Sequence, residues 1–527
     1  MEVNCGRPLL LALVLAIAVH AEAQQPLRIG TITVRALDVF SMDEAEHGFF
    51  YRAADRLHIE TRKKVIRRFL LFHEGDVYRP ERLAETERNL RALSFLKSAT
   101  VTASPPHDGV VDVIVTTQDA WSIAPETQAG SKGGTSTYGA SLSDTNLLGY
   151  GKDVELGWDK GVDRTRFGLN YNDPAFFAPY WRAHFGYAIN SDGYDHRVSV
   201  RRPFYSFATP WATEFAFTGF RQNDRLFDRG VEVTRFGQKH RELLAGYGIA
   251  LDPNDQNASR ITAGLRFTDD NFFPLPDRSP LGIPAAREFR YLFVKFERAG
   301  NDYVKLNFVN KDLRYEDFNL GGSTSIEAAV SPKAFGADST SGFLRFAAGE
   351  GMRFGDNAFF MPSAAVSTRL DRGPQNTVAT ANLLYVLRGG ADYPHALVGR
   401  LTMNSGWRLD REVQFFADGL SGLRGYRLHS FAGSRAITMN LEERMYLGRE
   451  ILQLASPAVV AFVDSGNATY GRMSDLLAFK TDLGVGIRIG LPRTPRNVLR
   501  IDFAYALNRD PLGRRGWIVS FSSGQAF

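Results

Sequence analysis

Cysteine is almost absent from this chain, since Cys5 is the single one among 527 residues. It lies before an apolar run at residues 9–19, which follows Arg7 and precedes the small-x-small sequence Ala21-Glu22-Ala23. This pattern predicts a signal peptide over residues 1–23 that is removed on export. The mature chain then contains no disulfide, no thiolate metal site and no cysteine nucleophile.

Long apolar runs and blocks of like charge are also missing. After the first 20 residues no run approaches the ~20 apolar residues that a helical span requires, which excludes a polytopic helical membrane protein. The net charge of +5 is spread along the chain without a Lys/Arg block, so no nucleic-acid partner is expected. By contrast, 39 Phe, 19 Tyr and 49 Gly are present. This composition excludes a disordered chain and is typical of a large, aromatic-rich β-structure.

Enzyme signatures are absent as well. The sequence contains neither H-E-x-x-H nor G-x-S-x-G, and no P-loop or dinucleotide fingerprint opens a strand–helix unit. Its ten histidines are scattered. We therefore expect no enzymatic activity, no cofactor and no metal site. A serine–histidine site assembled by the fold stays open as an alternative, because such sites are recognised by geometry rather than by spacing.

Residues 24–118 have a mixed pattern of strands and helices, which predicts a small α+β domain of order β-α-α-β-β. Its first part, residues 24–60, is longer than one strand and a connection require. The expected elements are a strand over 27–34, a helix over 61–72 with Thr61 as its N-cap, a second helix opening at Pro80, and strands over 98–103 and 110–117.

From Trp121 onward the pattern changes to strict alternation. In residues 260–268, for example, Ile261 and Leu265 lie on one face and charged Arg260 and Arg266 on the other. Alternation alone fits either a soluble sandwich or a membrane barrel. The length of the segment, the lack of disulfides in an exported chain and the aromatic residues at 176–181 favour the barrel. The sequence thus predicts a mainly β protein in which residues 119–527 form a sixteen-stranded transmembrane antiparallel β-barrel.

Several short motifs follow one another along the chain. They are Asn146-Leu147-Leu148-Gly149-Tyr150-Gly151, Tyr171-Asn172-Asp173-Pro174, Arg202-Pro203-Phe204, Leu423-Arg424-Gly425-Tyr426, Asn440-Leu441-Glu442-Glu443-Arg444, Phe462-Val463-Asp464-Ser465-Gly466 and Gly484-Val485-Gly486, before a final strand that ends at Phe527. This set resembles the outer-membrane assembly superfamily that includes BamA, TamA and the two-partner-secretion transporters. The sequences HEGDVYRPERLAETERNLRALSFLKSATV and DGVVDVIVTTQD resemble its POTRA (polypeptide-transport-associated) domain.

The resemblance implies a site in the barrel lumen. In this superfamily a long sixth extracellular loop folds back into the barrel, which here gives Leu423, Arg424, Gly425 and Tyr426 as the loop motif. The arginine of that motif meets an acidic residue of the F-x-D-x-G strand, which pairs Arg424 with Asp464. A planar guanidinium in a confined lumen suits a carboxylate. The other implied lumen residues are Gly466, Gly484, Gly486, Asn440, Glu442 and Arg444. The alternative is that Arg424 and Asp464 are ordinary solvated charges.

The resemblance also implies a function and a place. The protein would insert or translocate other proteins at the bacterial outer membrane, with the POTRA domain in the periplasm. The sheet edge at Val101 would capture an unfolded or extended protein substrate by strand addition. Trp517, Phe521 and Phe527 would share one face of a terminal strand at a weak seam. Outer-membrane lipids are implied partners, and a periplasmic or lipoprotein accessory factor is a further candidate. The rivals are a dedicated secretion pore, a diffusion channel that retains the motifs, and a structural or adhesive surface protein.

Overall fold

The computed structural model describes residues 26–39, 59–276, 282–311, 313–390, 394–451, 454–493 and 498–527. The predicted signal peptide and part of the 24–60 extension lie outside these residues. Within the described part, no helix has the length and apolarity needed to cross a membrane.

In the described residues, the N-terminal domain is a three-stranded sheet with two helices. Its elements are β1 (Arg28–Leu37), α3 (Lys63–Arg67), α4 (Pro80–Arg91), β2 (Leu96–Ala103) and β3 (Val110–Asp119). The sheet order is β1-β3-β2, with β1 parallel and β2 antiparallel to β3. Apolar side chains from both helices and all three strands form one core, which includes Ile66, Leu90 and Val113. This core holds α4 against the sheet.

The first helix of the domain is shorter than the sequence predicts. It spans five residues, and its N-cap is Arg62 without a side-chain cap bond. The prediction that Thr61 caps it is wrong, because the Thr61 hydroxyl accepts a hydrogen bond from Asn146 instead, at 2.9 Å. The backbone N–H of Thr61 donates to Asp119 at 2.7 Å. Thr61 therefore ties the domain to the connection around Asn146 in the following β-structure.

The remaining strands close into an antiparallel barrel of 20 strands in the described residues, not 16. The prediction of 16 is wrong because many connections are tight turns. Gly133 and Gly134 join the first two strands, and Arg229 and Gly230 join the two longest, all with positive φ. Two-residue turns of this kind match the twist of a hairpin. Because they use few residues, the same length of chain forms more strands.

The barrel strands follow one another around the wall in chain order. They are β4 (Ile123–Lys132), β5 (Thr135–Asp144), β6 (Asp153–Lys160), β7 (Thr165–Asp173), β8 (Arg182–Asn190), β9 (Gly193–Arg202), β10 (Trp211–Asp228), β11 (Val231–Ala250), β12 (Asn257–Phe273), β13 (Arg287–Gly300), β16 (Ser323–Ser331), β17 (Ser341–Gly349), β18 (Met352–Phe354), β19 (Ala358–Leu370), β20 (Pro374–Arg388), β21 (His395–Trp407), β24 (Arg435–Tyr446), β25 (Ser456–Thr469), β26 (Lys480–Gly490), β27 (Val498–Ala506) and β28 (Trp517–Ser523). β17 and β18 both pair with β19 and count as one interrupted strand.

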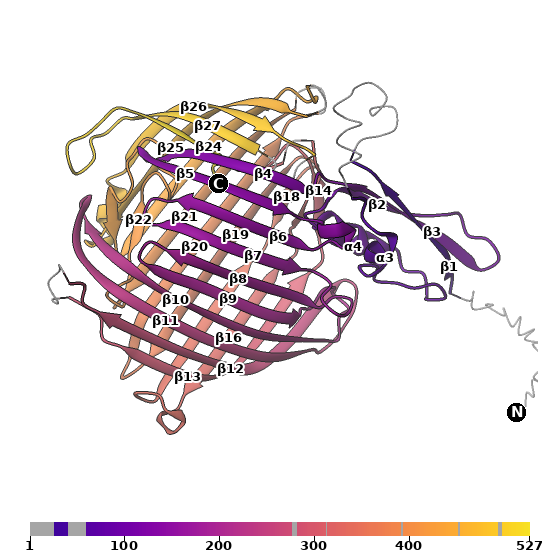
Figure 1. Cartoon of the computed structure of the whole chain (residues 1–527), viewed down its shortest axis with the longest axis horizontal. Coiled ribbons are helices and arrows are strands. Elements are labelled where there is room, and N and C mark those ends of the chain that lie inside the picture. The colour runs from indigo at the N-terminus through magenta and orange to yellow at the C-terminus, as the bar shows by residue number, and fades with distance from the viewer. Residues whose placement is uncertain are drawn as a thin grey trace, which may run out of the picture.

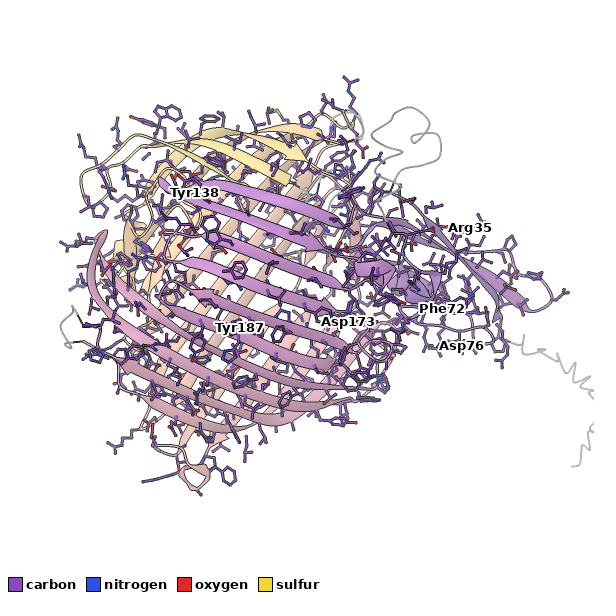
Figure 2. All side chains as sticks on the ribbon, viewed as in Figure 1. Arg35, Phe72, Asp76, Tyr138, Asp173 and Tyr187 are labelled. Carbon is purple, nitrogen blue, oxygen red and sulfur yellow. The ribbon has the colours of Figure 1, made fainter. Side chains whose placement is uncertain are left out.

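The two faces of the barrel wall differ in polarity. Large apolar side chains such as Trp158, Leu265 and Val294 are exposed on the outside, whereas Glu442 and Asp502 are fully buried inside. Figure 2 shows side chains on the outer wall, including Tyr138 and Tyr187. Closure pairs neighbouring strands around the wall, and an apolar outer face is favourable only in lipid. This architecture spans a membrane.

The N-terminal domain lies against one end of the barrel, which we call the proximal end (Figure 1). It contacts the strand connections there. Arg62 lies over the ring of Tyr150, Tyr180 donates to the carbonyl of Leu70, and Arg79 pairs with Asp255 at 2.9 Å. The opposite end is the distal end. The short 3₁₀ helices η1 (Leu147–Gly149), η2 (Lys333–Phe335) and η3 (Met473–Leu477) lie in connections.

Among the described residues, two small hairpins lie outside the barrel ladder. β14 (Tyr303–Leu306) pairs with β15 (Glu316–Asn319) in the proximal connection between β13 and β16. β22 (Phe415–Ala417) pairs with β23 (Phe431–Gly433) in the distal connection between β21 and β24. The second of these hairpins carries the Leu423-Arg424-Gly425-Tyr426 motif.

Candidate functional site: an ion-pair cluster in the barrel lumen

The connection that carries the arginine motif runs from the distal end back into the barrel. It is the eighth distal connection along the described strands, not the sixth. Five strands follow it, as would follow a sixth loop in a sixteen-stranded barrel, so the four additional strands precede it. Asp418 holds the turn before the motif, because its carboxylate accepts the N–H groups of Leu420 and His429.

Arg424 at the tip of this connection is buried and forms a two-pronged contact with Asp464 of β25. Its Nε donates to Asp464 Oδ2 at 2.7 Å and its Nη2 to Oδ1 at 2.9 Å. The guanidinium carbon lies 3.4 Å from the centroid of the Phe462 ring. The carboxylate of Asp464 neutralises the charge of the guanidinium, and the ring of Phe462 covers its flat face. The structure thus brings together the two residues that the sequence motifs pair.

Glu442 of β24 is the central anion of the cluster. It accepts Arg424 Nη1 at 2.7 Å, Arg444 Nε at 2.9 Å and Arg488 Nη2 at 3.3 Å. Asn440, two residues earlier on the same face, bridges the strand to the loop by donating to Asp464 and to the carbonyl of Gly422. One carboxylate thus joins three arginines from three different chain segments.

Sequence reasoning missed the far side of this cluster. Arg488 of β26 donates to Asp502 of β27 at 2.7 Å, and Arg500 pairs with the same carboxylate at 3.3 Å. Asp502 lies on the polar face of the alternating segment at residues 499–505. The signal was therefore present, since charged residues recur on the inward faces of the last strands, but no motif marks these positions.

The glycines named with the site make room for this packing. A Cβ on Gly484 would lie 2.4 Å from the Phe462 ring, and one on Gly486 would lie 2.4 Å from an Asp502 oxygen. Gly425 lets the loop tip approach β26, because a Cβ there would meet Asp482 at 2.5 Å. Gly466 faces the neighbouring strand, where a Cβ would meet the carbonyl of Ile437 at 2.4 Å. Larger residues would displace the arginine or its supports.

The apolar residues of the motif anchor the loop. Leu423 and Tyr426 are buried in a small cluster with Phe431 and inward-facing alanines. The Tyr426 hydroxyl donates to the carbonyl of Thr481 at 3.0 Å. The loop is therefore held by apolar packing on either side of the charged contact.

The last strand departs from the predicted pattern. Trp517 and Phe521 lie on the outer face of β28, but Phe527 does not continue it. Gly524 has φ +83° and ends the strand, and Phe527 turns inward, 5.5 Å from the Arg444 guanidinium. The prediction that Phe527 shares the face of Trp517 is wrong. The positive φ of Gly524 ends the extended backbone, so side chains beyond it no longer alternate between the two faces of the strand.

The first and last strands meet at a weak junction. In the described residues, β28 pairs with β4 at a single position, Phe521 opposite Ser131. By comparison, β28 pairs with β27 at seven positions, which run from Leu499 to Tyr505 on β27. Fewer ladder hydrogen bonds make this junction the weakest place in the wall.

Val101 lies on β2, which is one of the two edge strands of the domain sheet. Its backbone N–H donates to the carboxylate of Glu87 in α4 at 3.0 Å. Burial alone would raise the pKa of Glu87, but hydrogen bonds from Val101 and Lys305 outweigh it and hold that pKa below its usual value. The edge position singled out by the sequence therefore already has a side-chain partner.

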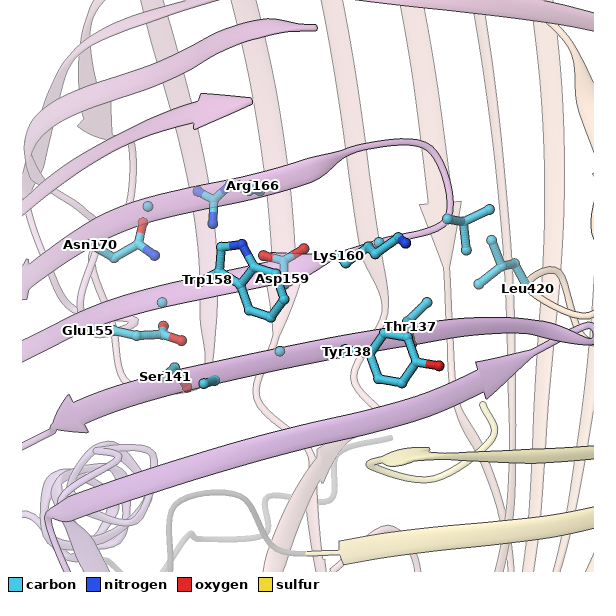
Figure 3. Close-up of a pocket in the computed structure, with 16 residues that line it drawn as sticks. Thr137, Tyr138, Ser141, Glu155, Trp158, Asp159, Lys160, Arg166, Asn170 and Leu420 are labelled. Atoms are coloured by element: carbon cyan, nitrogen blue, oxygen red, sulfur yellow. The ribbon is translucent and has the colours of Figure 1, made fainter. Parts of the chain in front are cut away.

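Hollow regions remain in the barrel wall. A cavity of about 230 Å³ lies along β5, β6 and β7, lined by Glu155, Asp159 and Arg166 and reached by Leu420 (Figure 3). A larger hollow of about 830 Å³ runs across β13 to β21, where most of the lining side chains, such as Thr324, Ala364 and Leu383, face outward. In the described residues, no group of three His, Cys, Asp or Glu side chains could hold a metal.

These features define a class: a transmembrane β-barrel with a docked N-terminal α+β domain and a loop arginine bound inside its lumen. No protein-family model matches the chain, and no curated protein matches it either. Similar solved structures include CdiB from Acinetobacter baumannii, at 12% identity and a TM-score of 0.49 over 95% of this chain and 74% of that one. CdiB from Escherichia coli is 13% identical, with a TM-score of 0.47 over 94% and 76%.

BamA from Haemophilus ducreyi lacking POTRA domains 1–3 is also similar, at 12% identity and a TM-score of 0.38 over 94% of this chain and 84% of that one. CdiB and BamA fall in the outer-membrane assembly superfamily that the sequence motifs resemble. At such low identity these likenesses say nothing of activity.

Proposed function

We propose that this protein inserts or translocates other proteins at the outer membrane of a Gram-negative bacterium. In this proposal the N-terminal domain is a POTRA domain in the periplasm, so the proximal end faces the periplasm and the distal end the exterior. The substrate is an unfolded or extended polypeptide, and outer-membrane lipids surround the barrel. No enzymatic step and no cofactor enter.

The observation that carries the proposal is the contact of Arg424 with Asp464. A loop tip that returns from the far end of a barrel to form a buried ion pair is costly to build, because both charges must leave water. A simple diffusion channel has no need of such a contact. The resemblance assigns the same contact, between the same motifs, to the outer-membrane assembly superfamily.

Two further features support the proposal. The junction of β4 and β28 offers a place where a substrate strand can pair with the barrel wall, since backbone groups there lack a full ladder. The β2 edge of the domain is the corresponding place in the periplasm. Strand addition suits a transporter of many sequences, because backbone hydrogen bonds are tolerant of sequence.

A dedicated secretion pore of the two-partner type is the second candidate. The cavity of about 230 Å³ along β5 to β7 favours it, because its lining residues Glu155, Asp159 and Arg166 face the lumen and would offer polar contacts to an extended chain. A diffusion channel that retains the family motifs is less well supported, since the loop and a proximal hairpin occupy the lumen.

Strand capture at β2 gives a first test of the proposal. A photo-crosslinking residue at Thr100, whose side chain is exposed on β2, is expected to form adducts with polypeptide in growing cells. Val101→Pro removes the edge N–H and should reduce these adducts and the function by about tenfold while the barrel still assembles. The same probe at exposed Glu81 of α4 is the control. Equal adducts at both positions, unaffected by the proline, would exclude capture by strand addition.

A further inference from the structure

The proximal connection between β13 and β16 folds into the barrel instead of turning tightly outside it. We call the described residues 301–311 and 313–322 the inner hairpin. Its apolar residues pack on inward-facing residues of β19, β20, β21, β24 and β25, at positions where the barrel wall is elsewhere polar. The packed residues are Val304, Leu306, Phe308, Val309 and Leu320 from the hairpin, and Phe359, Val386, Ala396, Val398, Tyr446 and Ala458 from the wall. Apolar burial of this extent seats the hairpin firmly inside the proximal mouth.

The tip of the inner hairpin reaches the ion-pair cluster. The carbonyl of Val309 accepts hydrogen bonds from Arg444 and, at 3.0 Å, from the Tyr446 hydroxyl. The carbonyl of Asn310 accepts Gln525 Nε2 at 3.2 Å. Gln525 follows Gly524, where the last strand turns inward. The hairpin thus holds both an arginine of the cluster and the inward end of β28.

The other side of the inner hairpin is bound to helix α4 of the N-terminal domain. Arg91 makes a two-pronged contact with Asp317, at 2.9 and 2.6 Å. Lys305 donates to Glu87 at 3.0 Å. The contact of Arg91 with Asp317 is charge-assisted and largely shielded from solvent, whereas the Lys305 side chain is 40% exposed. The domain therefore fastens the hairpin in place.

Glu87 connects this fastening to the sheet edge. One of its oxygens accepts Lys305 and Arg91, and the other accepts the N–H of Val101 on β2. A strand that adds to β2 needs the same N–H, because ladder pairing uses every outward backbone donor of the edge. Such a strand must displace the Glu87 carboxylate, and with it the contacts to Lys305 and Arg91.

We propose that the inner hairpin is a plug that closes the proximal mouth, and that Glu87 is its latch, which an extended polypeptide opens by pairing with β2. Release of the hairpin would then free the inward end of β28 beside the weak junction. The identity of the opening ligand as an extended polypeptide rests on the proposed function. Closure of the mouth by the hairpin does not.

Excision of the hairpin tests closure. The N–H of Gly300 donates to the carbonyl of Gly322 at 2.8 Å, so removal of residues 302–320 leaves Asn301-Gly321 as a two-residue turn of the most favourable composition. The barrel should therefore still close. In planar bilayers with KCl, the purified excision variant, with its N-terminal domain retained, is expected to have a mean conductance about tenfold above that of the unaltered protein, because an open mouth replaces a packed one. Conductance equal to that of the unaltered protein would overturn the proposal.

A point variant tests the latch. Glu87→Gln keeps an acceptor for Val101 but loses the charge that holds Lys305 and Arg91. We expect it to raise the open probability by roughly tenfold, since loss of one charge-assisted network shifts a two-state equilibrium by about that factor. Glu81→Gln, on the exposed first turn of the same helix, is the matched control. Equal behaviour of the two variants would show that Glu87 is no latch.

An added strand tests the opening signal. The probe is a synthetic peptide with the sequence of residues 517–527, and its control has proline at the positions of Val519 and Phe521. The first should raise the open probability of the unaltered protein, and the control should not. With Arg91→Cys and Asp317→Cys joined by a short thiol cross-linker, the peptide should have no effect.

The mature chain offers no competing cysteine for this cross-link, because Cys5 lies in the predicted signal peptide. A peptide without effect on the unaltered protein would overturn the opening by strand addition. If excision opens the barrel but loss of the gene changes no envelope protein, the plug stands and the proposed function fails.

Discussion

Replacing Arg424 with alanine is expected to destabilise the barrel by about 3–5 kcal/mol, the usual cost of breaking a buried ion pair. The reason is that Asp464 and Glu442 would each keep a buried charge without the guanidinium that now binds both. The loop between β21 and β24 should become mobile, and activity should be lost. Heat-dependent mobility in gels and the unfolding temperature in detergent measure the effect.

A double-mutant cycle sharpens this prediction. Asp464→Ala should cost slightly less than Arg424→Ala, because Arg424 would still bind Glu442. The double variant should be little worse than Arg424→Ala, since both changes remove the same contact. Arg427→Ala, an exposed arginine in the same loop, is the control and should have a small effect. If the loss of stability in the double variant equals the sum of the two single losses, the interaction between Arg424 and Asp464 contributes no stability.

The largest single loss of stability is expected for Glu442→Gln. This change keeps the shape of the side chain but removes the charge that three arginines share, so Arg424, Arg444 and Arg488 would repel one another in a confined lumen. We expect a loss greater than that of Arg424→Ala, above about 4 kcal/mol, or failure to assemble the barrel.

The neighbouring Glu443→Gln provides the control for this variant. Glu443 lies on the opposite face of β24, where it pairs with His395 and is about one-third exposed. Its replacement should cost less than about 1 kcal/mol, as for other partly exposed pairs. The assembled fraction in isolated membranes measures both variants. Equal losses at Glu442 and Glu443 would contradict the central role of Glu442.

The sequence predicts the parts of this protein that follow a repeating rule. The alternation of apolar and polar residues around Ile261 and Leu265 predicts that the apolar face of the strand points out of the barrel, and the structure has that arrangement. The ordered motifs place Arg424 and Asp464 on elements that meet in the barrel. The number of strands was mispredicted because turn length is not visible in alternation, as the two-residue turn at Gly133 and Gly134 illustrates.

The inner hairpin was not predicted for a different reason. Val304 and Leu306 alternate with polar residues as any membrane strand would, so the pattern does not separate a strand in the wall from a hairpin inside it. The available signal lay elsewhere, in the apolar residues Phe359, Val386 and Val398 at inward positions of the wall. An inward apolar patch requires a cover, and only the fold identifies which segment supplies it.

The central claim is that this barrel moves other proteins, and loss of the gene tests it most directly. In a deletion strain, quantitative measurement of outer-membrane and secreted proteins is expected to show the depletion of one protein or a small set. The unaltered gene should restore these levels and Arg424→Ala should not. Uptake of small solutes should be unchanged by the deletion. An unaltered set of envelope and secreted proteins together with reduced solute uptake would contradict the account and indicate a diffusion channel.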